Sequence, residues 1–256
     1  MEITFAQITQ WLGYFWWPFV RCAGFFIFSP IYGDGAVPSR VKILLAMIFA
    51  FLLMPIIESA PPFNPFSFTT VLITFYQLLF GAMIGFSIML FFTIYTMAGQ
   101  AISMQMGLAM AIMNDPSNGI SVAIIGRFFL ILCTLLFLSF DAHLVILAIF
   151  KESFELWPLD NPIPYQSLLE LAKMFSWVIA SALMMALPAI VIMLMSNIAF
   201  GVMNKAAPSL NVFALGFPMT MVLGMFALAI SLTGVGDSYL SKLLEMQDYM
   251  RHIMGL

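Results

Sequence analysis

Residues 70–97 read TVLITFYQLLFGAMIGFSIMLFFTIYTM, and this uncharged run sets the class of the protein. An α-helix needs about 20 mostly apolar residues to cross the hydrocarbon core of a bilayer, and this run exceeds that length. The whole chain has the same character, because 63% of its 256 residues are hydrophobic and only 8% are charged. No soluble domain of this size covers so much apolar surface with so few charges. The sequence therefore predicts an integral membrane protein, or an obligate part of a larger hydrophobic assembly.

About six hydrophobic segments are long enough to form such helices, and breakers such as the proline-rich link at 60–65 separate them. They predict an all-α fold of kinked helical hairpins. Ser167 with Glu170 predicts a capping box that opens the fifth segment. The fourth and fifth segments exceed a bilayer's thickness, so they must tilt, kink or leave the membrane. The six segments are 11–30, 41–57, 70–97, 122–150, 171–203 and 212–234.

The stretch that follows residue 97 differs from its neighbours. Residues 98–122 read AGQAISMQMGLAMAIMNDPSNGISV, which is apolar yet does not read as a membrane helix. Gly99 and Gly107 loosen it, and residues 115–119 must turn. If it is helical, Met106, Met110 and Met113 share one face. Methionines of this kind either fill gaps in an ordinary core or form a deformable seal, since unbranched thioethers conform to irregular surfaces.

The tail at residues 237–254 predicts an amphipathic helix. Its apolar stripe contains Tyr239, Leu243, Met246, Met250 and Ile253, with charged residues on another face. Such a helix lies on a membrane surface or docks on a partner protein. The docking alternative assigns Leu243, Met246 and Met250 to the contact with the partner.

No catalytic, cofactor or metal site is predicted. The chain has only two histidines, and its two cysteines, Cys22 and Cys133, are expected to be buried thiols. A net charge of −3 gives no basic footprint for nucleic acid. Asp141 and His143 lie in an apolar run, where a proton relay, a helix break or a subunit contact is possible. Arg21 and Arg127 are expected to pair between helices or subunits, with Asp115 or Asp141 as partners for Arg127.

Several motifs together resemble the family of the flagellar biosynthetic protein FliR, the R subunit of the flagellar type III export gate. They run in order along almost the whole chain, and each is weak alone. They are GAVPSRVK at 35–42, AGQ at 98–100, QMGL at 105–108, Asp115-Pro116, Arg127, FDAHL at 140–144, ALP at 186–188, NKAAPSLNVF at 204–213 and GFP at 216–218.

This resemblance implies a subunit that assembles with FliP and FliQ into a closed, funnel-like pore, with FlhB and FlhA as further partners. It implies a bacterial inner-membrane protein of the flagellar basal body that contacts lipid and exported flagellar proteins. Residues 1–165 would resemble P hairpins, residues 166–236 a Q hairpin, and residues 237–256 a tail. The loop 106–121 would plug the channel through Met106, Gly107, Leu108, Met110, Met113, Asn114, Asp115 and Pro116. Subunit packing would involve Arg40, Arg127, Asp141, His143, Pro188, Asn204, Pro208, Asn211, Phe213, Gly216 and Pro218.

Three alternatives stay open at this point. One is the equivalent subunit of a virulence type III secretion system. Another is a stand-alone transporter or channel, which would need ionisable residues at mid-membrane and two related halves with broken helices. An intramembrane enzyme is the third, with Asp141 and His143 as its remaining candidate residues.

Overall fold

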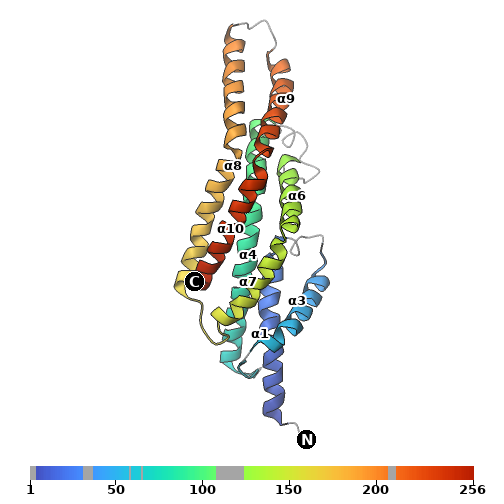
Figure 1. The fold of residues 1–256 in the computed structure, drawn as a ribbon, viewed down its shortest axis with the longest axis vertical. Coiled ribbons are helices and arrows are strands. Elements are labelled where there is room, and N and C mark those ends of the chain that lie inside the picture. Colours follow the sequence, from blue (N-terminus) through green and yellow to red (C-terminus); the bar gives the residue numbers. More distant parts are fainter. Residues whose placement is uncertain (1–3, 31–36, 58, 65, 108–123, 207–211) are drawn as a thin grey trace. The chain divides into compact units, whose positions relative to one another are not determined.

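The computed structural model describes residues 4–30, 37–57, 59–64, 66–107, 124–206 and 212–256, with residues 5, 6 and 212–218 placed by backbone only. Within these ranges the fold is all-α, as predicted (Figure 1). The elements are α1 (Phe5–Phe28), α3 (Ser39–Leu53), the short 3₁₀-helix η1 (Met54–Ile56), α4 (Phe68–Gln105), α6 (Ile124–Ser139), α7 (Ala142–Leu156), α8 (Tyr165–Ala206), α9 (Val212–Leu232) and α10 (Val235–Met254).

The chain divides into two compact units, and each unit is assembled from distant parts of the sequence. Unit 1 comprises Met1–Leu90, Asp141–Phe175 and Leu244–Leu256, and unit 2 comprises Phe91–Phe140 and Ser176–Leu243. The predicted division into residues 1–165, 166–236 and 237–256 concerns likeness to other subunits and stays a prediction.

Three helices of the described chain are long and apolar enough to cross a membrane: the segment Ser39–Ile56, α4 and α8. Two bent pairs raise this number to five if each pair is one span. The first predicted segment forms α1 but does not meet this criterion, since its Trp, Tyr, Gln and Arg side chains lower its mean hydropathy. Membrane character is confirmed, whereas the predicted number of six segments is not.

The over-long fourth segment is broken, which is one of the three outcomes predicted for it. Helix α6 ends at Ser139, α7 begins at Ala142, and the two axes differ by 71°. Asp141 lies at the break with a φ of 52°, a left-handed conformation that Asp tolerates better than most residues. By contrast, the fifth segment lies within one continuous helix, the 42-residue α8, which passes through Pro188.

The predicted capping box at Ser167 is wrong. Helix α8 begins two residues earlier, at Tyr165, so Ser167 lies inside the first turn and its N–H donates to the carbonyl of Pro164. Glu170 instead accepts a hydrogen bond from Lys173 Nζ at 2.6 Å. Helix α8 therefore begins directly after the proline-containing link that ends at Pro164, and not at the predicted capping box.

Helices α1 and α4 of unit 1 pack backbone to backbone. A Cβ atom added to Gly81 would collide with the carbonyl oxygen of Arg21, and one added to Gly85 would collide with that of Phe25. From the other helix, a Cβ on Gly24 would collide with the carbonyl of Leu78. Gly81 and Gly85 form a Gly-x-x-x-Gly pair, the spacing that lets two helices approach closely in a membrane. These three glycines set the distance between α1 and α4.

Replacement of Gly81 by Leu is expected to lower the thermal unfolding midpoint of the detergent-purified chain. The added side chain has no space at the backbone of Arg21, and overpacking of this kind costs about 1–3 kcal/mol or more. Gly201→Leu is the matched control, because a Cβ there meets no atom within 4 Å. Equal midpoints for the two variants would contradict the close α1–α4 contact.

Candidate functional site

The predicted plug begins directly after α4, and two residues of its base are described. The N–H of Met106 donates to the carbonyl of Ile102, and that of Gly107 donates to Met104. Gly107 has a φ of 77°, the left-handed conformation with which many helices end. The sequence predicted that Gly107 loosens this stretch, and the helix does stop there.

Gly99 has a different role from the predicted one. It lies inside α4, which continues as a regular helix to Gln105. A Cβ on Gly99 would lie 2.7 Å from the Cα of Gly126 and 2.8 Å from the carbonyl oxygen of Ile125. Gly99 therefore permits close packing of α4 on α6 and does not loosen the helix.

Met106 is packed inside unit 2. Its side chain is buried and lies against Gly224 of α9, where an added Cβ would be 2.7 Å from Met106 Cε and 2.9 Å from its Sδ. A side chain held in this way anchors the base of the loop. The other predicted plug residues, which are Leu108, Met110, Met113, Asn114, Asp115 and Pro116, lie outside the described residues.

Aromatic side chains of α4 and α10 form a second buried contact in unit 2. The ring of Tyr239 lies 5.5 Å from that of Tyr95, 5.3 Å from Phe91 and 5.7 Å from Phe140. Among the described atoms, the hydroxyl oxygens of Tyr95 and Tyr239 are buried without a hydrogen-bond partner. The cluster fixes the first half of α10 to α4 through ring packing.

Unit 1 contains a charged residue in its interior. Arg21 of α1 is fully buried, and its guanidinium bonds to neutral acceptors. Its Nε donates to Gln77 Oε1 at 2.7 Å, one terminal nitrogen donates to the carbonyl and hydroxyl of Ser153 at 2.7 and 3.2 Å, and the other donates to the carbonyl of Trp157 at 2.9 Å. The guanidinium carbon lies 4.1 Å from the ring centre of Phe154. No carboxylate pairs with Arg21 among the described residues.

The Arg21 network joins three parts of the chain that are far apart in sequence. Gln77 of α4 accepts from Arg21 and donates through Nε2 to the carbonyl of Leu159 at 3.1 Å. The acceptors on Ser153 and Trp157 lie at the end of α7. Arg21 was expected to pair between helices, but the sequence did not identify these acceptors, two of which are backbone carbonyls. They hold the link after α7 in place against α1 and α4.

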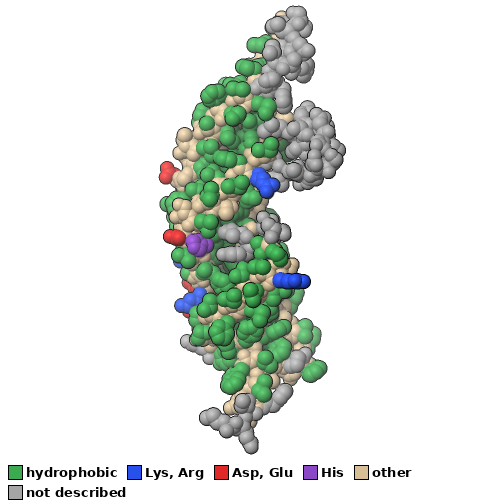
Figure 2. All heavy atoms as spheres, turned by 90° about the vertical axis from the view of Figure 1, so that its right-hand side faces the viewer, with side chains coloured by type: hydrophobic (Ala, Val, Ile, Leu, Met, Phe, Trp, Pro, Cys, Tyr) green, Lys and Arg blue, Asp and Glu red, His purple; other side chains and the backbone are tan. Residues whose placement is uncertain are grey.

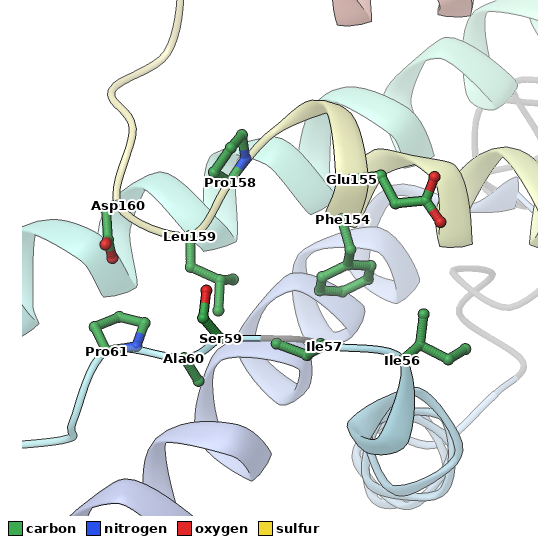
Figure 3. Close-up of a pocket in the computed structure, with 10 residues that line it drawn as sticks. All are labelled: Ile56, Ile57, Ser59, Ala60, Pro61, Phe154, Glu155, Pro158, Leu159 and Asp160. Atoms are coloured by element: carbon green, nitrogen blue, oxygen red, sulfur yellow. The ribbon is translucent and has the colours of Figure 1, made fainter.

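A pocket of about 630 Å³ lies next to this link (Figure 3). One wall comes from residues 56, 57 and 59–61, and its carbonyl at Pro61 accepts from Trp17 Nε1 at 2.9 Å. The other wall comes from residues 154–160 at the end of α7. Leu159 and Ala60 also belong to a buried cluster with Trp17. Hydrogen bonds to α1 and α4 therefore fix both walls.

The residues predicted to pack against other subunits are dispersed, and those with described side chains are mostly at the surface. Arg40, Arg127, Asp141 and Pro188 are exposed, whereas His143 and Asn204 are partly buried. Arg127 forms no ion pair with Asp141 among the described residues. Asp115, its other predicted partner, lies outside them, so pairing of Arg127 between helices or subunits stays a prediction. Pro208 and Asn211 lie outside the described residues, and Phe213, Gly216 and Pro218 are placed by backbone only.

Residues 12–246 match the model of a family described as bacterial export proteins, family 1. The chain belongs to this family. The flagellar biosynthetic protein FliR of Pectobacterium carotovorum is 36% identical to it over 88% of this chain and 87% of that protein. FliR of Escherichia coli is 33% identical over 90% and 88%, and FliR of Bacillus subtilis is 26% identical over 84% of each chain.

The resemblance to FliR is thus confirmed, and it places this export-family member among proteins of the flagellar export apparatus. One residue assignment needs correction. Leu243, Met246 and Met250, which were expected to dock on a partner, are all buried in this chain. The amphipathic periodicity of α10 is confirmed, but its apolar stripe packs inside the protein, because Tyr239 already contacts Phe91 and Tyr95 of α4.

Replacement of Arg21 by Leu in this export-family chain is expected to lower the free energy of unfolding by about 3 kcal/mol or more. The change leaves buried acceptors on Gln77, Ser153 and Trp157 without donors, and each such group costs about 1–3 kcal/mol. Denaturant titration of the purified chain measures this loss.

Arg127→Leu is the matched control for the Arg21 variant, since Arg127 is exposed and forms no ion pair among the described residues. It should change the unfolding free energy by less than about 0.5 kcal/mol. An Arg21 variant as stable as this control would contradict the structural role of the network.

Proposed function

We propose that the chain is the R-type subunit of the flagellar type III protein export gate. In this role it combines with FliP and FliQ into a closed channel in the inner membrane of the basal body, through which unfolded flagellar proteins pass. FlhB and FlhA are further proposed partners. The similarity to FliR over 88% and 90% of the chain carries the proposal. The role is that of a channel component and requires no catalytic residue.

The surface of the described chain supports a role inside an assembly. Large hydrophobic side chains are exposed along α3, α8 and α9, including Phe51, Leu52, Met184, Met195 and Phe226. Hydrophobic side chains also prevail on the face drawn in Figure 2, where Lys, Arg, Asp and Glu are few. Apolar surface of this extent needs lipid or other subunits to cover it. FliP, FliQ and membrane lipid are the proposed cover.

The geometry next to residues 108–123 supports a plug. Gly99 of α4 and Gly126 of α6 are in contact, so the two helices that flank residues 108–123 in the sequence pack against each other. Met106 fixes one end of the loop against Gly224. We propose that the segment between these packed helices moves aside for an exported chain and then returns, as a reversible closure requires.

The energies fit a reversible closure. A 10⁴-fold preference for the closed state needs about 5.5 kcal/mol. Since Met106 is already packed in the chain, Met110 and Met113 remain as sealing methionines. Full burial of two Met side chains gives up to about 3–6 kcal/mol. Only the upper end of this range reaches the required preference, so further contacts of the plug must contribute to the seal. A preference of about 5.5 kcal/mol is still small enough for an exported chain to overcome.

The mass of the intact complex tests the assembly. A tagged chain extracted from membranes of a flagellated host in mild detergent is expected to co-purify with FliP and FliQ, and intact-complex mass spectrometry should give one copy of this chain with several copies of each partner. A monodisperse monomer that carries out substrate flux alone would favour the stand-alone transporter instead.

Removal of residues 108–120 tests the plug. In the assembled complex this deletion is expected to raise ion conductance across the membrane, because the channel loses its closure. The double variant Met110→Ser with Met113→Ser should leak to a smaller extent, and Met104→Ser, at an exposed position of α4, should not leak. Unchanged conductance after the deletion would exclude this loop as the plug.

A further inference from the structure

The pocket between residues 56–61 and 154–160 has walls of mixed character (Figure 3). Phe154 and Leu159 point toward the segment that carries Ile57, Ser59 and Ala60, so the middle of the pocket holds apolar side chains and one hydroxyl. The carboxylates of Glu155 and Asp160 stand at opposite ends of this row. Both acidic residues are exposed. The pocket therefore combines apolar side chains and the Ser59 hydroxyl in its middle with a negative charge at each end.

No cation of the described chain neutralises these two carboxylates. Lys151 lies one turn before Glu155 on α7, but the two side chains are not within ion-pair distance. The ion pair between Lys173 and Glu170 is on α8, which contributes no residue to the pocket. Both negative charges of the pocket are thus available to a cationic ligand.

The walls of the pocket are preformed. The carbonyl of Trp157 is held by Arg21, that of Leu159 by Gln77, and that of Pro61 by Trp17. These bonds fix the backbone on both sides before any ligand arrives. A preformed pocket binds with little ordering cost, and about 630 Å³ is within the usual range of binding pockets.

We infer that this pocket binds a segment of another protein in which Lys or Arg residues flank an apolar side chain. The apolar side chain packs between Phe154 and Ile57, and the basic side chains reach Glu155 and Asp160. A lipid phosphate would be repelled by the two carboxylates. The inference goes beyond the proposed function, because it names a binding site and the chemistry of its ligand whichever protein supplies the segment.

A protein segment fits better than a small free cation. Exposed ion pairs contribute little by themselves, so two of them hold a small diamine only weakly. A segment that belongs to a larger interface adds burial of its apolar side chain, and the rest of the interface raises its effective concentration.

Site-directed photo-crosslinking in cells tests the site with the full chain. A photoreactive phenylalanine at Ser59, an exposed residue of the pocket wall, is expected to crosslink to a protein segment whose sequence, mapped by mass spectrometry, contains Lys or Arg beside an apolar residue. The double variant Glu155→Gln with Asp160→Asn should reduce the yield roughly three- to tenfold, as expected for the loss of two exposed ion pairs. Glu152→Gln, on the same helix but not lining the pocket, is the matched control and should leave the yield unchanged.

A charge exchange completes the test. Glu155→Lys with Asp160→Lys should abolish the crosslink, and Glu at the mapped basic positions of the partner should restore it. Crosslinks that are insensitive to neutralisation, that map to a segment without basic residues, that form only with lipid, or that do not form at all would overturn the inference. The mass of the export complex is measured separately, so failure of the pocket is distinguishable from failure of the proposed function.

Discussion

The guanidinium of Arg21 is fully buried, and its charge must be stabilised by the chain itself because no water reaches it. Carbonyls of Ser153 and Trp157 and the amide oxygen of Gln77 supply this stabilisation. These acceptors belong to α4 and to the end of α7, so neither element can move away from α1 without leaving a buried charge unsatisfied. The arrangement of α1, α4 and α7 in unit 1 depends on this requirement.

Close approach of the helices makes the network possible. The main-chain carbonyl of Arg21 faces Gly81 of α4. The Arg21 side chain reaches Gln77, which lies one turn before Gly81 on α4. A larger residue at position 81 would push α1 outward and lengthen the bond to Gln77. The glycines and the arginine are therefore parts of one contact. The glycines set the distance between α1 and α4, and the charge of Arg21 determines which acceptors on α4 and α7 must face α1.

Much of the fold follows from hydrophobic pattern and length. Long apolar runs predicted the helices, and the excess length of residues 122–150 allowed for the break that Asp141 forms. The Arg21 acceptors could not be predicted, since carbonyls 132 and 136 residues away carry no sequence signal. The Gly81-x-x-x-Gly85 spacing was the one available indication that α4 packs closely on another helix.

The contacts of α10 and Met106 were less predictable than the helices, because periodicity identifies an apolar face but not what packs against it. Periodicity showed that α10 has one apolar face, but it does not say whether that face meets the same chain, a partner or lipid; the packing of Tyr239 on Phe91 and Tyr95 decides this. Met106 illustrates the same point, because its spacing to Met110 suggested a shared role in sealing. Its contact with Gly224 instead packs it inside unit 2, directly after the end of α4. Helical spacing therefore places methionines on one face of a helix, but it does not show that they share one environment or one role.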